Sequence, residues 1–212
     1  MKILVVAATQ LELGYLGNMP FSENLKVITE VLGVGQMATT YRLLDSIGHH
    51  KPDLAIQIGI AGCFSNNISL GEVMSIETEY MGDVGAEENG SFQSIFDLNL
   101  VNENEKPFTS KGLVNPHKAL LDRIQLKKVV GITVNEISTS SHRIHQYKTM
   151  YNPMLETMEG AAFHYCCLMK NLPFIQIRAV SNYVGERNKS NWKIDAALQA
   201  VATSTKAFIS NL

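Results

Sequence analysis

Short apolar runs alternate along the chain with segments in which apolar residues recur at helical spacing. The runs predict buried strands over residues 3–7, 26–32, 54–60, 72–79, 129–134 and 174–180. The segments with helical spacing predict helices over residues 36–50, 159–169 and 194–212. Strands that alternate with helices are typical of an α/β fold with a mostly parallel central sheet.

One predicted helix has an apolar face, and one long segment has little apolar periodicity. The helix predicted over residues 36–50 carries Met37, Tyr41, Leu44 and Ile47 near one face. Residues 82–116 are rich in Gly, Asn, Glu and Ser and have only short apolar runs. We expect this middle segment to be a long loop with little regular structure, and loops of this kind are commonly functional.

Composition limits the class of protein. The length of 212 residues fits one α/β domain over residues 1–212, and two small domains are a less favoured alternative. Eighteen basic and twenty acidic side chains give a net charge of −2, which disfavours nucleic-acid binding because no basic excess is present to neutralise phosphates. The apolar residues 1–8 are too short for a membrane span and lack the build of a signal peptide.

The three cysteines, Cys63, Cys166 and Cys167, form no CxxC pair and no zinc-like spacing. We expect them to be small buried residues with reduced thiols, which indicates a cytoplasmic protein without a metal site.

Polar residues lie at the end of the last predicted strand and just after it, where Arg178 is followed by Ser181 and Asn182. Ligands of open α/β sheets bind outside the carboxyl ends of the strands, so this amide is expected at a crevice. Glu159 follows Met158 at the start of a predicted helix. It is either a carboxylate that accepts hydrogen bonds from two sugar hydroxyls or a capping acid, and local sequence favours neither. An acid that holds a sugar and an amide that holds a base together indicate nucleoside chemistry.

Glu12 comes just after the first predicted strand. It can take a proton from water at the mouth of the crevice, but local sequence favours an ordinary acid in the first turn of a helix. Gly35 and Gly62 also come after predicted strands, where glycine lets the backbone approach a ligand. A plain tight turn explains Gly35 equally well, and the full GxGxxG pattern is absent.

His142, His145, Arg143 and Lys148 lie in a polar stretch, residues 138–151. We see no further ligands that would make this stretch a metal site. A solvated helix face is the favoured interpretation, and contact with a substrate carboxylate is the alternative.

Taken in order, these stretches resemble the superfamily of purine nucleosidases and phosphorylases. The resemblance runs nearly end to end and rests on the strand before Glu12, Gly33-Val34-Gly35, Gly59-Ile60-Ala61-Gly62, Met158-Glu159-Gly160-Ala161 and Arg178-Ala179-Val180-Ser181-Asn182. It implies a nucleoside phosphorylase-like three-layer α/β fold, with a mixed, mostly parallel central sheet flanked by helices. It also implies an N-ribosyl hydrolase that acts on a small-molecule nucleoside, needs no metal or organic cofactor and forms a homodimer or a higher homo-oligomer.

The resemblance implies roles for single residues. Glu12 matches the carboxylate that activates water in the superfamily, and Arg178 matches an arginine near that water. Glu159 matches the acid that holds the ribose hydroxyls, with Met158 packed on the sugar.

The backbone around Ala61 and Gly62 matches the lining of the purine site, but two nearby positions depart from the adenine-cleaving relatives. Asn182 stands where those relatives have Asp, and Ile60 stands where they have Ser. A protonated Asp can donate a proton to N7 of adenine, whereas the NH₂ of Asn donates hydrogen bonds to the O6 and N7 acceptors of a 6-oxopurine. Asn182 therefore favours hypoxanthine over adenine as the leaving base, while Ile60 changes the contacts around the attacking water.

Residues 82–87, residues 181–188 and Trp192 are similar to the futalosine hydrolase branch of the superfamily. That likeness implies cleavage of futalosine, an inosine-like nucleoside with a benzoate on its 5′ arm, to hypoxanthine and dehypoxanthine futalosine in menaquinone biosynthesis. Arg187, Arg143 or the hydroxyls of residues 138–141 are candidates to meet the benzoate. Three alternatives stay open: a methylthioadenosine/S-adenosylhomocysteine nucleosidase, a purine nucleoside phosphorylase and a nucleoside-binding protein without turnover. The absence of basic groups near residues 33–36 disfavours the phosphorylase.

Overall fold

The computed structural model describes residues 1–17 and 25–212. Its strands are β1 (Lys2–Ala7), β2 (Lys26–Val31), β3 (Leu54–Cys63), β4 (Val73–Met81), β5 (Gly85–Glu88), β6 (Ser91–Ser94), β7 (Leu113–Val114), β8 (Lys127–Thr133), β9 (Leu155–Thr157) and β10 (Phe174–Tyr183). Its helices are α1 (Gln10–Gly14), α2 (Gln36–His50), α3 (Lys118–Arg123), α4 (Ser141–Tyr151), α5 (Gly160–Lys170) and α6 (Ile194–Ser210), with a 3₁₀ turn at Lys189–Asn191.

A mixed sheet organises the molecule. Its strands follow the order β10-β4-β8-β9-β3-β1-β2, β7 pairs with β4, and β10 also pairs with β3. The pairs β1–β2, β1–β3, β3–β10, β4–β8 and β8–β9 are parallel, whereas β4–β10, β3–β9 and β4–β7 are antiparallel. Because β10 pairs on both sides, β3, β10, β4, β8 and β9 close into a ring.

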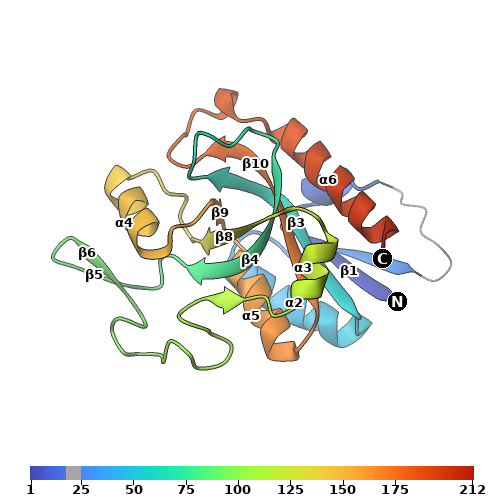
Figure 1. Ribbon diagram of the computed structural model, residues 1–212, viewed down its shortest axis with the longest axis horizontal. Coiled ribbons are helices and arrows are strands. Elements are labelled where there is room, and N and C mark those ends of the chain that lie inside the picture. Colours follow the sequence, from blue (N-terminus) through green and yellow to red (C-terminus); the bar gives the residue numbers. More distant parts are fainter. Residues whose placement is uncertain (18–24) are drawn as a thin grey trace.

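Helices cover both faces of this sheet, with α6 on one side and α2 and α5 on the other (Figure 1). Alternate side chains of a strand point to opposite faces, and β1 shows the pattern. Ile3, Val5 and Ala7 belong to the core shared with α6, whereas Leu4 and Val6 belong to the core shared with α2 and α5. A strand buried on both faces must be apolar throughout, which explains why the runs are continuous.

The structure confirms the predicted fold class and the predicted strands, with shifts at their ends. β3 continues beyond the predicted residue 60 to Cys63, so Gly62 lies within the end of the strand rather than after it. The middle segment, residues 82–116, is mostly irregular as expected, but it also contains the β5–β6 hairpin and the short strand β7. These strands have two to four residues each, too few for a clear alternation in sequence.

The predicted helix over residues 36–50 is α2, but its apolar face is largely turned away from the core. The buried residues of α2 are Thr39, Leu43 and Ser46. Met37 is 88% exposed, Tyr41 is 76% exposed and Leu44 is 37% exposed, and Ile47 alone of the four packs partly on the core. The spacing therefore predicted the helix correctly, while its apolar side faces outward from this chain.

Among the described residues, every helix is too short or too polar to cross a membrane.

Candidate active site

A cavity of about 320 Å³ opens where β1, β3, β9 and β10 end. Its walls are formed by Ala8, Thr9, Leu11, Glu12, Val34, Ile60, Ala61, Gly62, Ile137, Glu156, Thr157, Met158, Glu159, Arg178, Ser181, Asn182, Trp192, Ile194 and Leu198. Several segments far apart in the sequence thus supply one site, and most of its lining is apolar.

Glu12 is held by the start of α1. The Thr9 hydroxyl accepts a hydrogen bond from the Glu12 backbone N–H at 3.3 Å, and Glu12 Oε2 accepts from the Thr9 backbone N–H at 2.9 Å, which is a capping box. The Thr9 hydroxyl also lies 2.9 Å from Glu12 Oε2. The helix-start interpretation of Glu12 is therefore right, and the same carboxylate also lines the cavity while only 7% exposed.

Arg178 and Glu12 meet beside Gly59. A Cβ built at Gly59 would lie 2.7 Å from Glu12 Oε1 and closer still to Arg178 Nη1. Any larger residue at position 59 would therefore displace one of the two groups. Arg178 is 2% exposed, and its Nε and Nη2 have no hydrogen-bond partner among the described residues. A buried guanidinium with unused donors can hold a polar ligand or a water molecule in the cavity.

Glu159 lies at the N-terminal boundary of α5, but its carboxylate does not cap that helix. Instead Oε1 accepts a hydrogen bond from the backbone N–H of Gly35 at 2.9 Å, and Oε2 lies 3.8 Å from Arg178 Nη2. Burial raises the pKa of the Glu159 carboxyl, and the nearby Arg178 charge and the Gly35 N–H oppose that shift. The capping-acid alternative is therefore wrong for this side chain, which faces the cavity.

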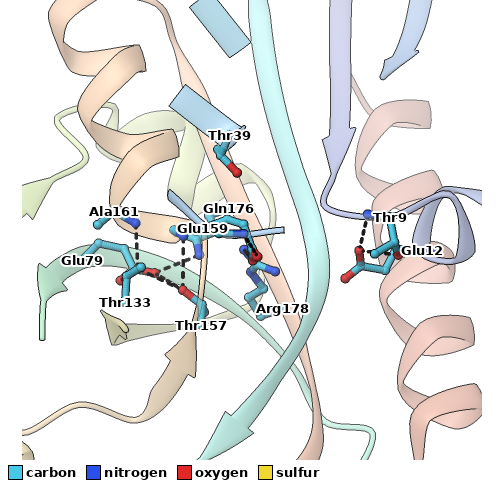
Figure 2. Close-up of polar contacts among 12 residues, drawn as sticks. Thr9, Glu12, Thr39, Glu79, Thr133, Thr157, Glu159, Ala161, Gln176 and Arg178 are labelled. Atoms are coloured by element: carbon cyan, nitrogen blue, oxygen red, sulfur yellow. Dashed lines mark hydrogen bonds and ion pairs between the residues drawn. The ribbon is translucent and has the colours of Figure 1, made fainter. Parts of the chain in front are cut away.

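A fully buried carboxyl, Glu79, supports the start of α5 from below (Figure 2). The hydroxyls of Thr133 and Thr157 donate to Glu79 at 3.1 and 3.3 Å. The same two hydroxyls accept the first backbone N–H groups of α5, from Ala161 at 2.7 Å and from Gly160 at 3.2 Å. Each threonine hydroxyl thus bridges the Glu79 carboxyl and a backbone N–H of α5. These bridges fix the chain directly after Glu159.

Glu79 is also bonded to the Gln176 amide, whose Nε2 donates to Oε1 at 2.9 Å. Burial raises the pKa of Glu79 to about 7, and the hydrogen bonds from Gln176 and the threonines, with the Arg178 charge, oppose that rise.

Asn182 lies near the end of β10, where a bulge interrupts the register between β10 and β3. Its Oδ1 accepts from the Ser181 hydroxyl at 2.8 Å, and its Nδ2 donates to the Tyr183 carbonyl at 3.1 Å. These bonds orient the amide, and the second Nδ2 hydrogen is left for a ligand in the cavity.

Comparison with known proteins agrees with this geometry. A protein-family model described as the phosphorylase superfamily matches residues 3–212. The chain belongs to the phosphorylase superfamily.

Among the curated members, the chain is 28% identical to a futalosine hydrolase of Thermus thermophilus, over 97% of the chain and 94% of that protein. It is 25% identical to a 5′-methylthioadenosine/S-adenosylhomocysteine nucleosidase of Staphylococcus aureus, over 88% of the chain and 81% of that protein. Among solved structures, a futalosine hydrolase of Helicobacter pylori superposes with a TM-score of 0.83 at 15% identity, covering 100% of this chain and 98% of the other. The predicted superfamily, its fold and the N-glycosyl hydrolase class of enzyme are confirmed.

Most of the site residues predicted for this phosphorylase superfamily member lie together. Glu12, Arg178 and Asn182 line the cavity, as do the predicted contacts Glu159, Met158, Ala61 and Gly62. Gly35 is outside the lining and reaches the site only through its N–H on Glu159.

The basic stretch before residue 151 forms the predicted helix α4, beside a second, polar cavity. Arg143 pairs there with Glu87 at 2.6 Å, and its guanidinium lies 5.2 Å from the centre of the Phe92 ring. The His142 ring lies 2.9 Å from the Gly90 carbonyl. Two of the groups suggested for a substrate carboxylate, Arg143 and His142, are thus already bonded to the β5–β6 hairpin.

Sequence reasoning missed several cavity residues in this superfamily member. Glu156 and Thr157 belong to β9, a strand of three residues that no run in the sequence indicated. Leu11, Val34, Ile137, Ile194 and Leu198 are aliphatic residues that local sequence cannot distinguish from core residues. Glu79 gave no signal either, because a single acid in a strand is ordinarily a surface residue.

Proposed function

We propose that this enzyme is a nucleosidase that hydrolyses futalosine and releases hypoxanthine. The observation that carries the proposal is Asn182, an amide in the cavity wall with a free donor. The futalosine hydrolase relative, matched over nearly the whole of both chains, supports the same substrate. Structures of superfamily members bound to nucleoside analogues support a small-molecule nucleoside as the ligand class.

Hydrolysis is favoured over phosphorolysis by the charges of the cavity. Arg178 is the one Lys, Arg or His among the described residues that line it, and the carboxylates of Glu12 and Glu159 lie beside that arginine. A phosphate dianion placed there would be repelled by two carboxylates and attracted by one cation. Water meets no such penalty.

The proposed reaction is a dissociative displacement at C1′. Glu159 accepts hydrogen bonds from the ribose hydroxyls and stabilises the positive charge that develops on the sugar. Glu12 takes a proton from the attacking water as general base, and the free donors of Arg178 hold that water. Asn182 donates to the purine, where negative charge collects as the C1′–N9 bond breaks. The released base takes up a proton from solvent, and Glu12 returns to solvent the proton that it took from water.

A second candidate is hydrolysis of methylthioadenosine or S-adenosylhomocysteine, since relatives with that activity match most of the chain. Asn182 argues against it, because a neutral amide is a weak proton source for N7 of adenine. A neutral donor suits a leaving base that already carries an acceptor at O6.

We further propose Arg187 as the contact for the benzoate of the 5′ arm. Its guanidinium lies 5.8 Å from the centre of the Trp192 ring, and Trp192 lines the cavity. Arg187 is exposed, whereas Arg143 is engaged with Glu87.

We propose that residues 1–212 act as one domain, because one sheet contains strands from Lys2 to Tyr183. We also propose a homodimer. Leu11 and Val34 line the cavity while 60% and 58% exposed, and the outward apolar face of α2 begins just after Val34. A second copy on this face would shield apolar surface that is costly to leave in water and would close the mouth of the cavity. A cytoplasmic location stays a prediction from sequence.

Replacing Glu12 with Ala tests the mechanism. Loss of a general base lowers kcat by about 100- to 10,000-fold, and futalosine binding stays within a few-fold because Glu159 and Asn182 remain. Steady-state kinetics and calorimetric titration of the variant with futalosine measure the two quantities. Near-normal turnover would overturn the role of Glu12, and a wild-type enzyme that binds but never cleaves would favour a nucleoside-binding protein.

A further inference from the structure

Glu156 is a carboxyl in the cavity wall that the mechanism above does not use. It belongs to β9, opposite Gly62 of β3, and only 7% of its surface is exposed. Its Oε1 accepts a hydrogen bond from the Ser138 backbone N–H at 3.2 Å. Its Oε2 has no hydrogen-bond partner among the described residues.

A buried carboxyl with an unused oxygen is costly to the fold unless something else bonds to it. Burial raises the pKa of Glu156, the Ser138 hydroxyl and N–H oppose that rise, and the Asp83 charge adds to it. Among the described residues, Glu156 has no cation within ion-pair distance. The missing partner is therefore a hydrogen-bond donor, and the cavity is where one can enter.

Glu156 and Asn182 border the same space. A Cβ built at Gly62 would lie 3.4 Å from Asn182 Nδ2 and 3.9 Å from Glu156 Cβ. Because Gly62 has no side chain, it adds no group of its own between the Asn182 amide and the base of the Glu156 side chain, and both residues line the cavity. One planar ligand can therefore meet an N–H donor from Asn182 and an acceptor from Glu156.

A 6-oxopurine presents the matching set of groups. Its O6 and N7 are acceptors and its N1 carries a hydrogen, whereas adenine has an acceptor at N1 and a donor at its 6-amino group. An ionised carboxylate accepts from N1–H and is repelled by a bare N1. We propose that Glu156 determines specificity by accepting a hydrogen bond from N1–H of a 6-oxopurine, while Asn182 donates to the edge that carries O6 and N7. This inference rests on the proposed hydrolysis of a 6-oxopurine nucleoside.

The variants Glu156→Gln and Glu156→Leu test this role against Glu136→Gln as a matched control, since Glu136 is an exposed carboxylate nearby that borders only the polar cavity. Dissociation constants of free hypoxanthine and adenine are measured by calorimetry, and kcat/KM is measured for futalosine and methylthioadenosine. Thermal unfolding confirms that each variant is folded, and Glu156→Gln keeps the shape of the side chain if Glu156→Leu does not fold.

A hydrogen bond to a charged group contributes about 10- to 100-fold in binding. We expect Glu156→Leu to weaken hypoxanthine binding by that factor. We expect Glu156→Gln to lower the ratio of hypoxanthine to adenine affinity at least tenfold, because its amide can donate to N1 of adenine. Glu136→Gln leaves the ratio unchanged.

Two outcomes separate this inference from the proposed function. If wild type releases hypoxanthine from futalosine and both Glu156 variants keep the base preference within twofold, the role of Glu156 is wrong and the function stands. If wild type does not cleave futalosine but still prefers hypoxanthine through Glu156, the proposed substrate is wrong and the role of Glu156 stands.

Discussion

Arg178 shows how single residues create the electrostatics of the site. Its guanidinium is almost wholly buried, lies beside Glu12 and Glu159, and keeps donors without partners. Removing one member of such a buried set leaves the others uncompensated. Gly59 is part of the same arrangement, because only glycine leaves room for both Glu12 and Arg178.

Asn182→Asp tests the leaving-group argument. A carboxylate in place of the amide loses the donor to O6 and N7, so we expect kcat/KM for hypoxanthine release from futalosine to fall by about 10- to 100-fold. Adenine release from methylthioadenosine should rise, because a protonated Asp can donate to N7. Chromatographic assay of the two bases measures both effects. Unaltered hypoxanthine release would contradict the specificity given to Asn182.

Glu79→Gln tests the buried carboxyl under α5 through the pH dependence of stability. In the folded state burial raises the pKa of Glu79 from 4.5 to about 7, so the folded chain holds this proton where the unfolded chain releases it. Its contribution to stability is therefore fully present below pH 4.5 and is lost as the pH rises through about 7. Gln does not titrate. Between pH 4.5 and 8, the unfolding free energy of the variant should therefore increase by roughly 3 kcal/mol relative to that of wild type.

Urea unfolding of both proteins at several pH values measures this difference. Glu77→Gln, on the same strand but less buried, is the control. A difference between wild type and Glu79→Gln that does not change with pH would contradict the buried titration.

The residues of the site could be predicted from sequence only in part. Glu12, Glu159, Arg178 and Asn182 were found because they belong to an ordered series of motifs that resembles the superfamily. Glu79 and Glu156 were not, because each becomes distinctive only through burial, and burial depends on neighbours far away in the sequence.

At the scale of elements, long periodic segments were predicted well and short ones were not. The predicted helix over residues 36–50 coincides with α2, whereas α3, with six residues, and β9, with three, were missed. A short element has too few residues for a period, and its place depends on the strands that receive it. The sequence pattern also could not predict which side of α2 faces the core, because periodicity shows that a face is apolar but does not show what covers it.

Tyr41→Glu tests whether the outward apolar face of α2 packs against a second copy of the chain. Tyr41 is 76% exposed between Met37 and Leu44, and a carboxylate there would be buried without a partner in a dimer. We expect wild type to sediment as a dimer and Tyr41→Glu as a monomer with reduced kcat/KM, because the mouth of the cavity is then open. Analytical ultracentrifugation gives the masses, and His49→Glu, exposed on another side of α2, is the control. A monomeric wild type would contradict the homodimer.

At the scale of the whole molecule, strand pairing brings the site together. The ring of β3, β10, β4, β8 and β9, with β1 next to β3, carries Glu12, Gly62, Glu159 and Asn182 to one cavity. The sequence pattern indicated a mostly parallel sheet, but it could not indicate that β10 pairs with both β3 and β4. That closure places Arg178 next to Gly59 in register, opposite the carboxylate of α1.

The most direct test of the account is incubation of the purified protein with futalosine, inosine and methylthioadenosine in phosphate-free buffer, followed by identification of the free base. We predict hypoxanthine from futalosine without added phosphate, and little base from the other two nucleosides. Adenine from methylthioadenosine with no hypoxanthine from futalosine would contradict the proposed function, even though the superfamily, the fold and the water-activating role of Glu12 would remain consistent with that result.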